Sequence, residues 1–332
     1  MDKILITGGA GFVGSVTAKL LVNNGYEVLI LDNFDKQVHS ISKGVTTNGL
    51  KEVTIIRKDV RNRKVIANLI KDVDGIIHLA AAVGVGQSSY EIEHYVDVNT
   101  RGTSLLLDVL INSEHSVKKM VIASSMSVYG EGQYYCNNCD EPKFPLARSK
   151  SQLIKKKWDY ICQSCYKILL PMPTNEKKPL NPTSIYAMTK RHQEEMCLLT
   201  GSTFGFPVTA LRYFNIYGTG QSLSNPYTGV ASIFLSRLIN QKNPYIFEDG
   251  LQKRDFIHVS DVARANLLAL DKRKGNYEVM NIGTGDPISI LEIANLLISY
   301  SEKQILPKIS KKYRIGDIRN CFADVHRAQE VL

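Results

Sequence analysis

A glycine-rich turn at residues 7–14 (TGGAGFVG) constrains the fold of this chain more than any other stretch. The run before it, residues 4–6, is apolar without polar alternation, which is typical of a buried parallel strand. After it, apolar residues recur at helical spacing as far as Gly25, where we expect the helix to end. A strand, a glycine turn and a helix in this order predict an α/β protein with a doubly wound parallel sheet of the Rossmann type. Such a turn directs backbone N–H groups at a diphosphate, although an ordinary glycine turn without a ligand is the alternative.

The next apolar run, residues 28–31, ends in Asp32. A carboxylate about 20 residues beyond the glycines can accept a hydrogen bond from a ribose 2′-OH, and it would repel a 2′-phosphate. We therefore predict that the chain binds NAD rather than NADP.

Strands and helices alternate along the first two thirds of the chain. The patterns predict strands at 53–56, 75–81, 119–123 and 208–211, helices at 61–71, 88–113 and from Ser184 onward, and a polar loop at 33–52. The helix at 88–113 is expected to be interrupted near Asn99 and Gly102. Beyond this part the alternation loosens, which indicates a smaller C-terminal α/β lobe with helices at 229–240 and 289–300 and a strand at 277–282. We predict a Rossmann domain at 1–217, interrupted by an insert at 131–178, and a lobe at 218–332, of which part of 255–285 returns to the first domain.

The charge and the apolar runs limit the classes of partner. The net charge is +9, from 41 Lys and Arg against 32 Asp and Glu. A basic surface suits nucleic acid or a nucleoside diphosphate, but the lysines are scattered and no aromatic-interleaved basic motif accompanies them, so no nucleic-acid partner is predicted. The N-terminus shows no leader, and no apolar run approaches the roughly 18 residues of a membrane span. We expect no membrane association and a cytoplasmic location.

The insert contains two Cys-x-x-Cys pairs, formed by Cys136, Cys139, Cys162 and Cys165. This spacing is typical of a zinc site, and in a reducing compartment a metal is favoured over disulfides. The rest of the insert shows little apolar content, so a metal would supply stability that the segment lacks. We predict a closed structural zinc site; four reduced, unligated cysteines are the alternative.

Two groups of residues carry candidate chemistry. Tyr186 and Lys190 stand four residues apart and share one helix face, and a cation beside a phenol lowers the phenol pKa toward the working pH. Serines 124, 125 and 127 follow the strand expected at 119–123, where open α/β sheets bind ligands, although they could merely cap the strand.

His78, Cys197 and Cys321 are expected to be buried. Forked guanidinium groups at Arg254, Arg314 and Arg319 could hold a diphosphate, although arginines more often form surface ion pairs.

Taken in order, these motifs resemble the extended short-chain dehydrogenase/reductase family, and within it the nucleotide-sugar epimerases and dehydratases. The resemblance rests on 7–14, Asp32, 59–60, 78–81, Asn99, Ser125, Tyr186 with Lys190, 212–218 and 254–261, and it covers nearly the whole chain apart from 131–178. It implies an NAD-binding Rossmann domain, a second lobe that holds a nucleoside-diphosphate sugar, and a homodimer formed through helices near 88–113 and 183–204.

The resemblance also implies a role for individual residues. Ser125 matches the catalytic Ser/Thr, Tyr186 the base, and Lys190 the lysine that lowers the pKa of the base and bonds the nicotinamide ribose. NAD contacts are implied for Gly8, Gly11, Phe12, Val13, Asp32, Asn33, Asp59, Val60, Leu79, Ala80, Ala81, Asn99, Tyr186 and Lys190. Substrate contacts are implied or considered for Val83, Ser125, Met126, Ser127, Asn215, Arg254, Arg314, Arg319 and Cys321.

Within the resembling family, the two positions after the catalytic Ser/Thr distinguish dehydratases from epimerases. Sugar 4,6-dehydratases carry an acidic pair directly after the catalytic Ser/Thr, and here Met126 and Ser127 occupy those positions. We therefore predict an isomerase, an NAD-dependent 4-epimerase that acts through a transient 4-keto sugar and keeps its NAD tightly bound. A dehydratase or reductase of the same family is the alternative. A non-catalytic dinucleotide sensor that docks a partner through the cysteine insert is the alternative of another class.

Two departures bear on the sugar. Cys321 stands where epimerases restricted to plain hexoses have a bulky Tyr, which resembles enzymes that admit N-acetyl or otherwise altered sugars. Val83 stands where UDP-galactose 4-epimerase has a lysine, which weakens the transfer of that substrate. The four-cysteine insert, with residues 32–39 and 83–88, resembles a branch labelled dTDP-L-rhamnose 4-epimerase or UDP-glucose 4-epimerase.

Overall fold

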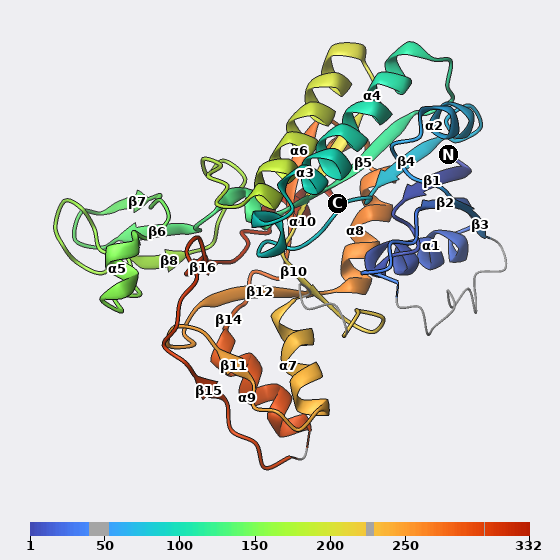
Figure 1. Cartoon of the computed structure of the whole chain (residues 1–332). Coiled ribbons are helices and arrows are strands. Elements are labelled where there is room, and N and C mark those ends of the chain that lie inside the picture. The colour runs from blue at the N-terminus through green and yellow to red at the C-terminus, as the bar shows by residue number, and fades with distance from the viewer. Residues whose placement is uncertain (40–52, 224–228, 302) are drawn as a thin grey trace.

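The centre of the fold is a parallel sheet. A computed structural model describes residues 1–39, 53–223, 229–301 and 303–332, and within them seven parallel strands pair in the order β13-β9-β5-β4-β1-β2-β3 (Figure 1). The strands are β1 (Lys3–Thr7), β2 (Glu27–Asp32), β3 (Val53–Arg57), β4 (Gly75–His78), β5 (Lys119–Ser125), β9 (Val208–Tyr213) and β13 (Glu278–Ile282). The strand order reverses between β1 and β4, and ligands of doubly wound sheets bind at such a switch point. The predicted Rossmann architecture is confirmed.

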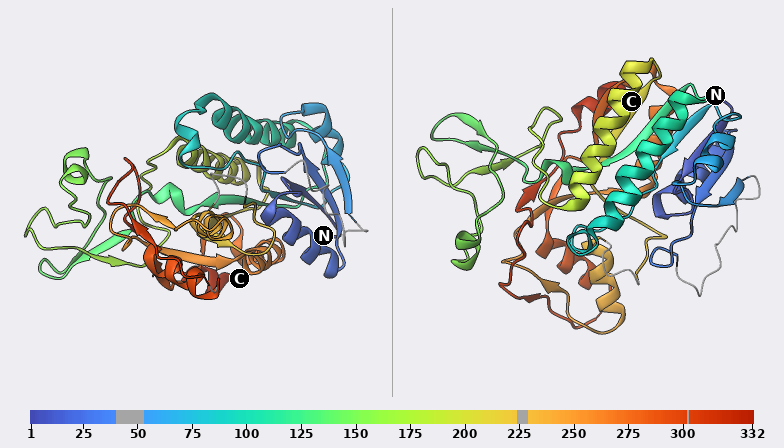
Figure 2. Two further views of the ribbon diagram at one scale, coloured as in Figure 1. Left: turned by 60° about the horizontal axis from the view of Figure 1, so that its bottom comes forward. Right: turned by 45° about the horizontal axis from the view of Figure 1, so that its top comes forward.

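Helices cover both faces of this sheet because its strands are apolar on both sides. In β1, Leu5 packs with the helices of one face, whereas Ile4 and Ile6 pack with those of the other; all three are fully buried. The first face carries α2 (Arg63–Leu69), α4 (Gly102–Asn112) and α6 (Ile185–Phe204), and the second carries α1 (Phe12–Asn23) and α8 (Val259–Asp271). Figure 2 shows α4 and α6 running side by side. Burial of this kind contributes roughly 25 cal/mol per Å² of apolar surface.

Two predicted elements differ from those observed. The strand expected at 75–81 ends at His78, so the small residues after it leave the sheet instead of extending it. The helix expected at 88–113 begins later. After a turn of 3₁₀-helix, η1 (Gln87–Ser89), it consists of α3 (Ile92–Tyr95), the π-helical stretch η2 (Val96–Arg101) and α4. The expected interruption near Asn99 and Gly102 is confirmed as this π-helix. Of the polar loop expected at 33–52, residues 40–52 lie outside the described residues.

The C-terminal part forms a smaller group of elements. A second sheet contains β10 (Asn215–Tyr217), β12 (Lys253–His258), β14 (Pro287–Ser289) and β16 (Asn320–Cys321). Next to it lie α7 (Val230–Ile239), α9 (Ile290–Tyr300) and the pair β11 (Tyr245–Ile246) and β15 (Lys308–Ile309), around a core that includes Phe234, Ile246 and Ile293. A capping box between Ser289 and Glu292 begins α9. From the segment 255–285, α8 packs on α1 and β13 pairs with β9, so both lie with the large sheet; α10 (His326–Val331) contacts β13.

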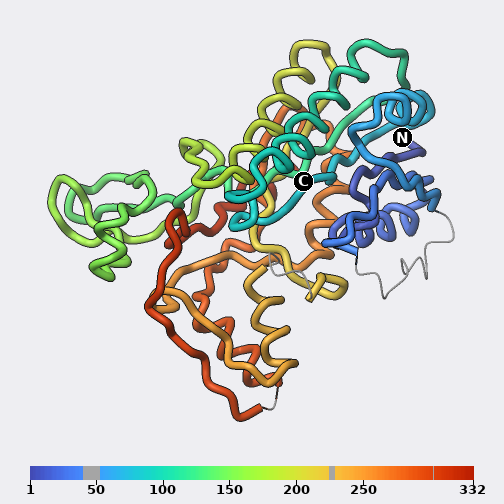
Figure 3. The backbone as a smooth tube through the Cα atoms, viewed as in Figure 1, coloured from blue at the N-terminus to red at the C-terminus, as the bar shows by residue number. Residues whose placement is uncertain are grey.

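The insert at residues 131–178 leaves the body of the molecule as an arm of its own (Figures 1 and 3). It is described throughout and contains a three-stranded antiparallel sheet in the order β7-β6-β8 and the short helix α5 (Lys150–Ile154). The strands are β6 (Gln133–Cys136), β7 (Glu141–Lys143) and β8 (Leu170–Met172). The expectation of little apolar content is wrong, because Tyr134, Tyr160 and Leu169 form a small buried core together with Cys136 and Cys162.

None of the described helices combines the length and the apolar character that crossing a membrane requires.

Candidate functional site

The glycine turn between β1 and α1 lies tightly against the segment that follows β4. Gly8 has a φ of +70°, and a Cβ built on it would lie 2.8 Å from the backbone nitrogen of Ala80. A Cβ on Gly14, in the first turn of α1, would lie 2.5 Å from the carbonyl oxygen of Gly8. Side chains are therefore excluded at both positions, because the turn packs tightly against its own backbone and against the segment after β4. This turn lies at the switch point between β1 and β4, where ligands of such sheets bind. Gly11, Phe12 and Val13 complete this turn and begin α1.

Asp32 lies where the motif predicts it, at the carboxyl end of β2 beside the glycine turn. Its carboxylate accepts hydrogen bonds from the backbone N–H groups of Ala10 (3.1 Å) and Phe34 (2.8 Å). Nε2 of His39 lies 3.5 Å away. The carboxylate is buried and fixed in direction, as recognition of a ribose hydroxyl requires.

Asp59 is held by its neighbours more strongly than the motif indicates. Arg61 donates to both of its carboxylate oxygens, at 2.8 and 2.7 Å, and Asn33 Nδ2 donates to one of them at 3.1 Å. The Arg61 hydrogen bond lowers the pKa of Asp59 to about 2. Val60, the next residue, is buried in the core between β2 and α4. Asn33, Asp59 and Val60 thus form the edge of the site beyond β2.

Asn99 clamps the segment that follows β4. It lies in the π-helical stretch η2 and is fully buried; its Oδ1 accepts from Ala82 N (2.7 Å) and its Nδ2 donates to Ala82 O (3.0 Å) and Thr189 Oγ1 (2.9 Å). Its amide is engaged by the protein, so it positions the segment of Leu79, Ala80 and Ala81 that faces Gly8.

His78 is buried between the hydroxyls of Thr7 (2.7 Å) and Thr103 (2.9 Å), as expected of a core histidine, and burial lowers its pKa to about 3.

The structure brings Ser125, Tyr186 and Lys190 together. Ser125 is the last residue of β5, and Tyr186 and Lys190 lie in the first turns of α6, which begins at the N-cap residue Ser184. The hydroxyl of Ser125 lies close enough to the buried phenol of Tyr186 to lower its pKa, and it accepts from Ser127 Oγ at 2.9 Å. Nζ of Lys190 donates to the carbonyl oxygen of Ala123, at 2.8 Å. A hydroxyl, a phenol and an ammonium therefore meet at the carboxyl end of β5.

The electrostatics of this group are governed by burial. Burial raises the pKa of Tyr186 to about 12, and the hydrogen bond with Ser125 offsets only part of that rise. Burial also lowers the pKa of Lys190 to about 8, because the ammonium is removed from water. Desolvation therefore dominates the pKa of the phenol in the protein alone. The lowering of this pKa by Lys190 together with a bound nicotinamide stays a prediction.

A buried ionic network behind this group was missed by the sequence analysis. Arg212, in β9, donates to both carboxylate oxygens of Glu194 (2.5 and 3.0 Å), and Ser124 Oγ donates to the same carboxylate at 2.5 Å. A further nitrogen of Arg212 donates to Tyr129 Oη at 2.8 Å. Glu194 continues the spacing of four from Tyr186 and Lys190, and that third member of the pattern is the signal that could have revealed it.

The residues predicted to contact substrate occupy several environments. Val83 is exposed, whereas Met126 and Ser127 are buried, and Ser127 Oγ donates to Ser125 Oγ at 2.9 Å. Met126 shares an apolar cluster with Cys321, although the two come from opposite parts of the chain. Among the described residues no hydrogen-bond donor reaches the buried Oδ1 of Asn215.

The three arginines predicted to hold a diphosphate differ in what their guanidinium groups contact. Arg254 donates to the backbone carbonyls of Ile318 (2.6 Å) and Arg319 (3.1 Å). Arg314 is exposed and pairs with Asp317 at 2.8 Å.

Arg319 does not present a free guanidinium. It is buried, and its nitrogens donate to Asp159 of the insert (2.9 Å) and to both oxygens of Asp249 (2.6 and 2.9 Å). The structure thus places it in an ionic cluster between the insert and the C-terminal part, an arrangement that does not favour the predicted contact with a diphosphate.

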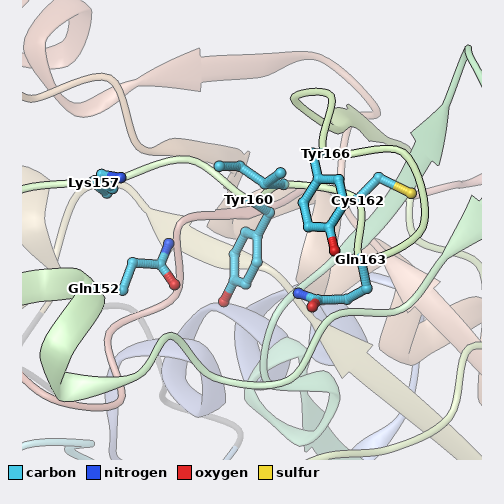
Figure 4. A pocket seen from close by; sticks show the side chains of 7 residues that line it. Gln152, Lys157, Tyr160, Cys162, Gln163 and Tyr166 are labelled. Carbon is cyan, nitrogen blue, oxygen red and sulfur yellow. The ribbon is translucent and has the colours of Figure 1, made fainter.

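The four cysteines of the insert converge on one point. Their sulfur atoms all lie within 4.8 Å of one another, with Cys136 Sγ 3.4 Å from Cys165 Sγ and Cys139 Sγ 3.7 Å from Cys162 Sγ. The residue after each pair, Asp140 or Tyr166, has a positive φ, so the two loops turn in the same way. A pocket of about 270 Å³ lies beside the second pair and is lined by residues of the insert alone. Figure 4 shows the side chains that line it, Cys162 among them.

Comparison with known proteins decides the family. Two overlapping stretches, residues 4–175 and 162–283, match the family model described as the NAD dependent epimerase/dehydratase family. The chain belongs to this family. The membership that the motifs predict is therefore confirmed, over a span that includes the glycine turn, Ser125 and Tyr186.

Several members of the epimerase family are similar over nearly their whole length. The dTDP-L-rhamnose 4-epimerase of Burkholderia thailandensis is 33% identical over 97% of this chain and 87% of its own. The UDP-glucose 4-epimerase of Thermotoga maritima, solved with UDP-glucose, is 28% identical over 99% of this chain and 91% of its own, with a TM-score of 0.78. The UDP-glucuronic acid 4-epimerase of Bacillus cereus, solved with its substrate and NAD, is 29% identical over 99% and 92%, also with a TM-score of 0.78.

Proposed function

We propose that this chain is an isomerase, an NAD-dependent nucleotide-sugar 4-epimerase that works through a transient 4-keto sugar. The observation that carries the proposal is the meeting of Ser125, Tyr186 and Lys190 at the carboxyl end of β5, on the same edge of the sheet as the glycine turn. The relatives named as 4-epimerases support the reaction.

The residues around the turn fit a dinucleotide. Gly8 and Gly14 leave no room for side chains, and Asp32 presents a fixed carboxylate. We assign the diphosphate to the turn of Gly8 and Gly11 with the N-terminus of α1, and the ribose hydroxyl to Asp32. When bound, NAD supplies a hydride acceptor that becomes the donor later in the same turnover.

In this mechanism the chain's own groups move one proton and orient the sugar. The phenol oxygen of Tyr186 takes the proton of the C4 hydroxyl and returns it once the 4-keto sugar has presented its other face. Ser125, which lies beside that phenol, orients the same hydroxyl. Lys190 holds a positive charge one helical turn away and favours the phenolate during the transfer. Met126 and Ser127 offer no carboxyl group for the removal of water, which favours epimerisation over dehydration.

Incubation with UDP-hexoses and dTDP-6-deoxyhexoses, followed by NMR, tests the proposal. We expect interconversion of C4 epimers without net production of NADH. Stoichiometric release of NADH would instead assign a dehydrogenase or decarboxylase reaction. No conversion of any nucleotide sugar would favour a protein that senses the dinucleotide without catalysis.

The sugar is proposed to differ from a plain hexose, for example by an N-acetyl group. Cys321 is a small residue in the apolar cluster with Met126, and the unpaired Oδ1 of Asn215 is available to a donor on the ligand. A panel that compares UDP-glucose with UDP-N-acetylglucosamine tests this, because equal or better turnover of plain glucose would contradict it.

We propose a structural zinc ion at Cys136, Cys139, Cys162 and Cys165. A tetrahedron with Zn–S bonds of about 2.3 Å has S···S edges of about 3.8 Å. Two of the separations in the cluster, 3.4 and 3.7 Å, are close to that edge, and the four sulfur atoms all lie within 4.8 Å of one another. Four thiolates close the coordination sphere, so this zinc would stabilise the insert and take no part in catalysis.

Elemental analysis of the purified chain is expected to find about one zinc per chain. Replacing Cys139 with Ser should remove most of this metal, because one of four ligands is lost. The matched control is Cys197→Ala, a buried cysteine of α6 outside the cluster, which should leave the metal content unchanged. A fully folded wild-type chain without metal would contradict the assignment.

We also propose a homodimer, formed through the helices near 88–113 and 183–204. These helices expose the apolar side chains of Ile92, Met188, Leu199 and Phe204, which a second copy would cover. Sedimentation velocity decides this directly.

A further inference from the structure

Glu131 is a buried carboxylate at the root of the insert that no catalytic assignment uses. It is only 3% exposed, and four donors surround it. Its Oε1 accepts from Tyr134 Oη (2.7 Å) and from the backbone N–H of Asn320 (2.6 Å). Its Oε2 accepts from Tyr160 Oη (3.1 Å) and from the backbone N–H of Arg319 (2.7 Å). Each oxygen therefore joins one tyrosine of the insert to one backbone group of the C-terminal part.

The two tyrosines belong to a repeated sequence unit. Residues 134–139 (YYCNNC) and 160–165 (YICQSC) both read Tyr-x-Cys-x-x-Cys. The two rings pack edge to face with their centroids 5.2 Å apart, in the same small core as Cys136 and Cys162. The position of each hydroxyl on Glu131 is thus tied to the position of a cysteine pair. This repeat, which the sequence analysis overlooked, is the signal that could have found the tyrosines.

On its other side, Glu131 holds the segment that forms β16. Asn320 and Cys321 pair in parallel with Lys253 and Arg254 of β12. The carbonyl groups of Ile318 and Arg319 accept the guanidinium hydrogen bonds of Arg254. The amides bound by Glu131 and the carbonyls bound by Arg254 therefore lie on the same short stretch of backbone.

A second set of buried charges joins the insert to the C-terminal part. Arg148 of the insert donates two hydrogen bonds to Glu248, at 2.8 and 2.7 Å, and a third to the carbonyl of Asp317 at 2.9 Å. Both side chains of this ion pair are almost fully buried. Because buried pairs of this geometry are costly to separate, the insert cannot shift without moving the backbone at 317–320.

We propose that Glu131 is a positioning residue that couples the four-cysteine insert to the substrate side of the enzyme. Tyr134 and Tyr160 fix its carboxylate, the carboxylate fixes the backbone of Arg319 and Asn320, and that backbone fixes Arg254 and Cys321. The insert thereby sets the affinity for the nucleotide sugar and leaves NAD binding unaffected. The inference rests on the proposed function, since it takes Arg254 and Cys321 as substrate contacts.

Glu131→Gln tests the coupling in the full-length enzyme. One oxygen is replaced by an NH₂ group that faces a backbone N–H, so the bond to that backbone group is lost while the volume is kept. We expect KM for the converted nucleotide sugar to rise about tenfold, with kcat within about twofold of wild type and the bound NAD unchanged. The control is Glu141→Gln, an exposed residue of β7 paired only with Lys143 within the described chain, which should leave KM unchanged. An unchanged KM in Glu131→Gln would overturn the inference while the proposed function stands.

A second measurement does not depend on activity. Tyr134→Phe and Tyr160→Phe each remove one hydroxyl from Glu131, and we expect faster hydrogen exchange at the amides of Arg319 and Asn320. Tyr135→Phe, in the same unit, is the matched control because its hydroxyl bonds to Asp140 at the surface. Equal exchange in all three variants would overturn the coupling. A wild-type chain that converts no nucleotide sugar would instead overturn the proposed function, and the exchange result would still report on the contact.

Discussion

Replacing Tyr186 with Phe is expected to lower kcat by about a hundred- to ten-thousandfold, the range typical for loss of a general acid–base group. The phenol oxygen is the one atom of the Ser125, Tyr186 and Lys190 group that can take a proton as an anion and return it. The bound NAD should be unchanged, because the proposed contacts at Gly8 and Asp32 do not involve the phenol. Steady-state kinetics and the absorbance of extracted cofactor measure both quantities.

The pH dependence of this variant gives a sharper criterion. Burial raises the pKa of Tyr186 to about 12, so the protonated phenol predominates at neutral pH and the active phenolate grows as pH rises. The wild-type rate should therefore increase with pH up to the pKa that the loaded enzyme displays, and the residual rate of Tyr186→Phe should not follow that increase. Tyr300→Phe, an exposed tyrosine of α9, is the control. A variant at position 186 with wild-type kcat would place the base elsewhere.

Replacing Arg212 with Met is expected to lower the free energy of unfolding by about 3–5 kcal/mol, the cost of leaving one buried charge without its partner. Among the described residues, Glu194 would then keep the Ser124 hydroxyl as its one donor in a buried site. Because Glu194 lies on α6 and Ser124 precedes Ser125 on β5, the same change should disturb the catalytic group. Denaturant unfolding measures the loss.

The helix supplies a matched control for Arg212→Met. Arg191 pairs with Glu195 on the exposed side of α6, at 2.7 Å, so Arg191→Met should change stability by no more than about 1 kcal/mol. The double variant Arg212→Met with Glu194→Leu should recover part of the stability, because the unpaired carboxylate is then gone. A loss below 1 kcal/mol in Arg212→Met would show that the pair contributes little to the fold.

Much of the fold was predictable because burial leaves a direct trace in the sequence. Apolar runs without alternation at 4–6 and 28–31 indicated a parallel sheet, and Asp32 with the glycine turn indicated the ligand edge. The spacing of four between Tyr186 and Lys190 indicated that they share one helix face, whereas Ser125 was singled out by the family resemblance.

The parts that could not be predicted depend on long-range contacts or on solvation. Arg319 resembles a surface arginine in the sequence, and only the fold brings Asp159 and Asp249 to it. The direction of the Tyr186 pKa shift depends on how much water the folded chain removes, which the spacing to Lys190 does not reveal. Glu131 is one acidic residue among 32 Asp and Glu, and its four donors come from three separate segments.

The π-helical stretch Val96–Arg101 has a consequence for chain length. A π-turn accommodates one more residue than an α-turn, so the helices on either side of it keep their faces although the chain between them is one residue longer. Deleting one residue there would therefore close the wide turn into an ordinary α-helix while α3 and α4 stay packed as they are. What would be lost is the local backbone that places Asn99 against both Ala82 and Thr189. Deleting one residue from the regular helix α4 would instead rotate the two helices relative to one another by about 100°.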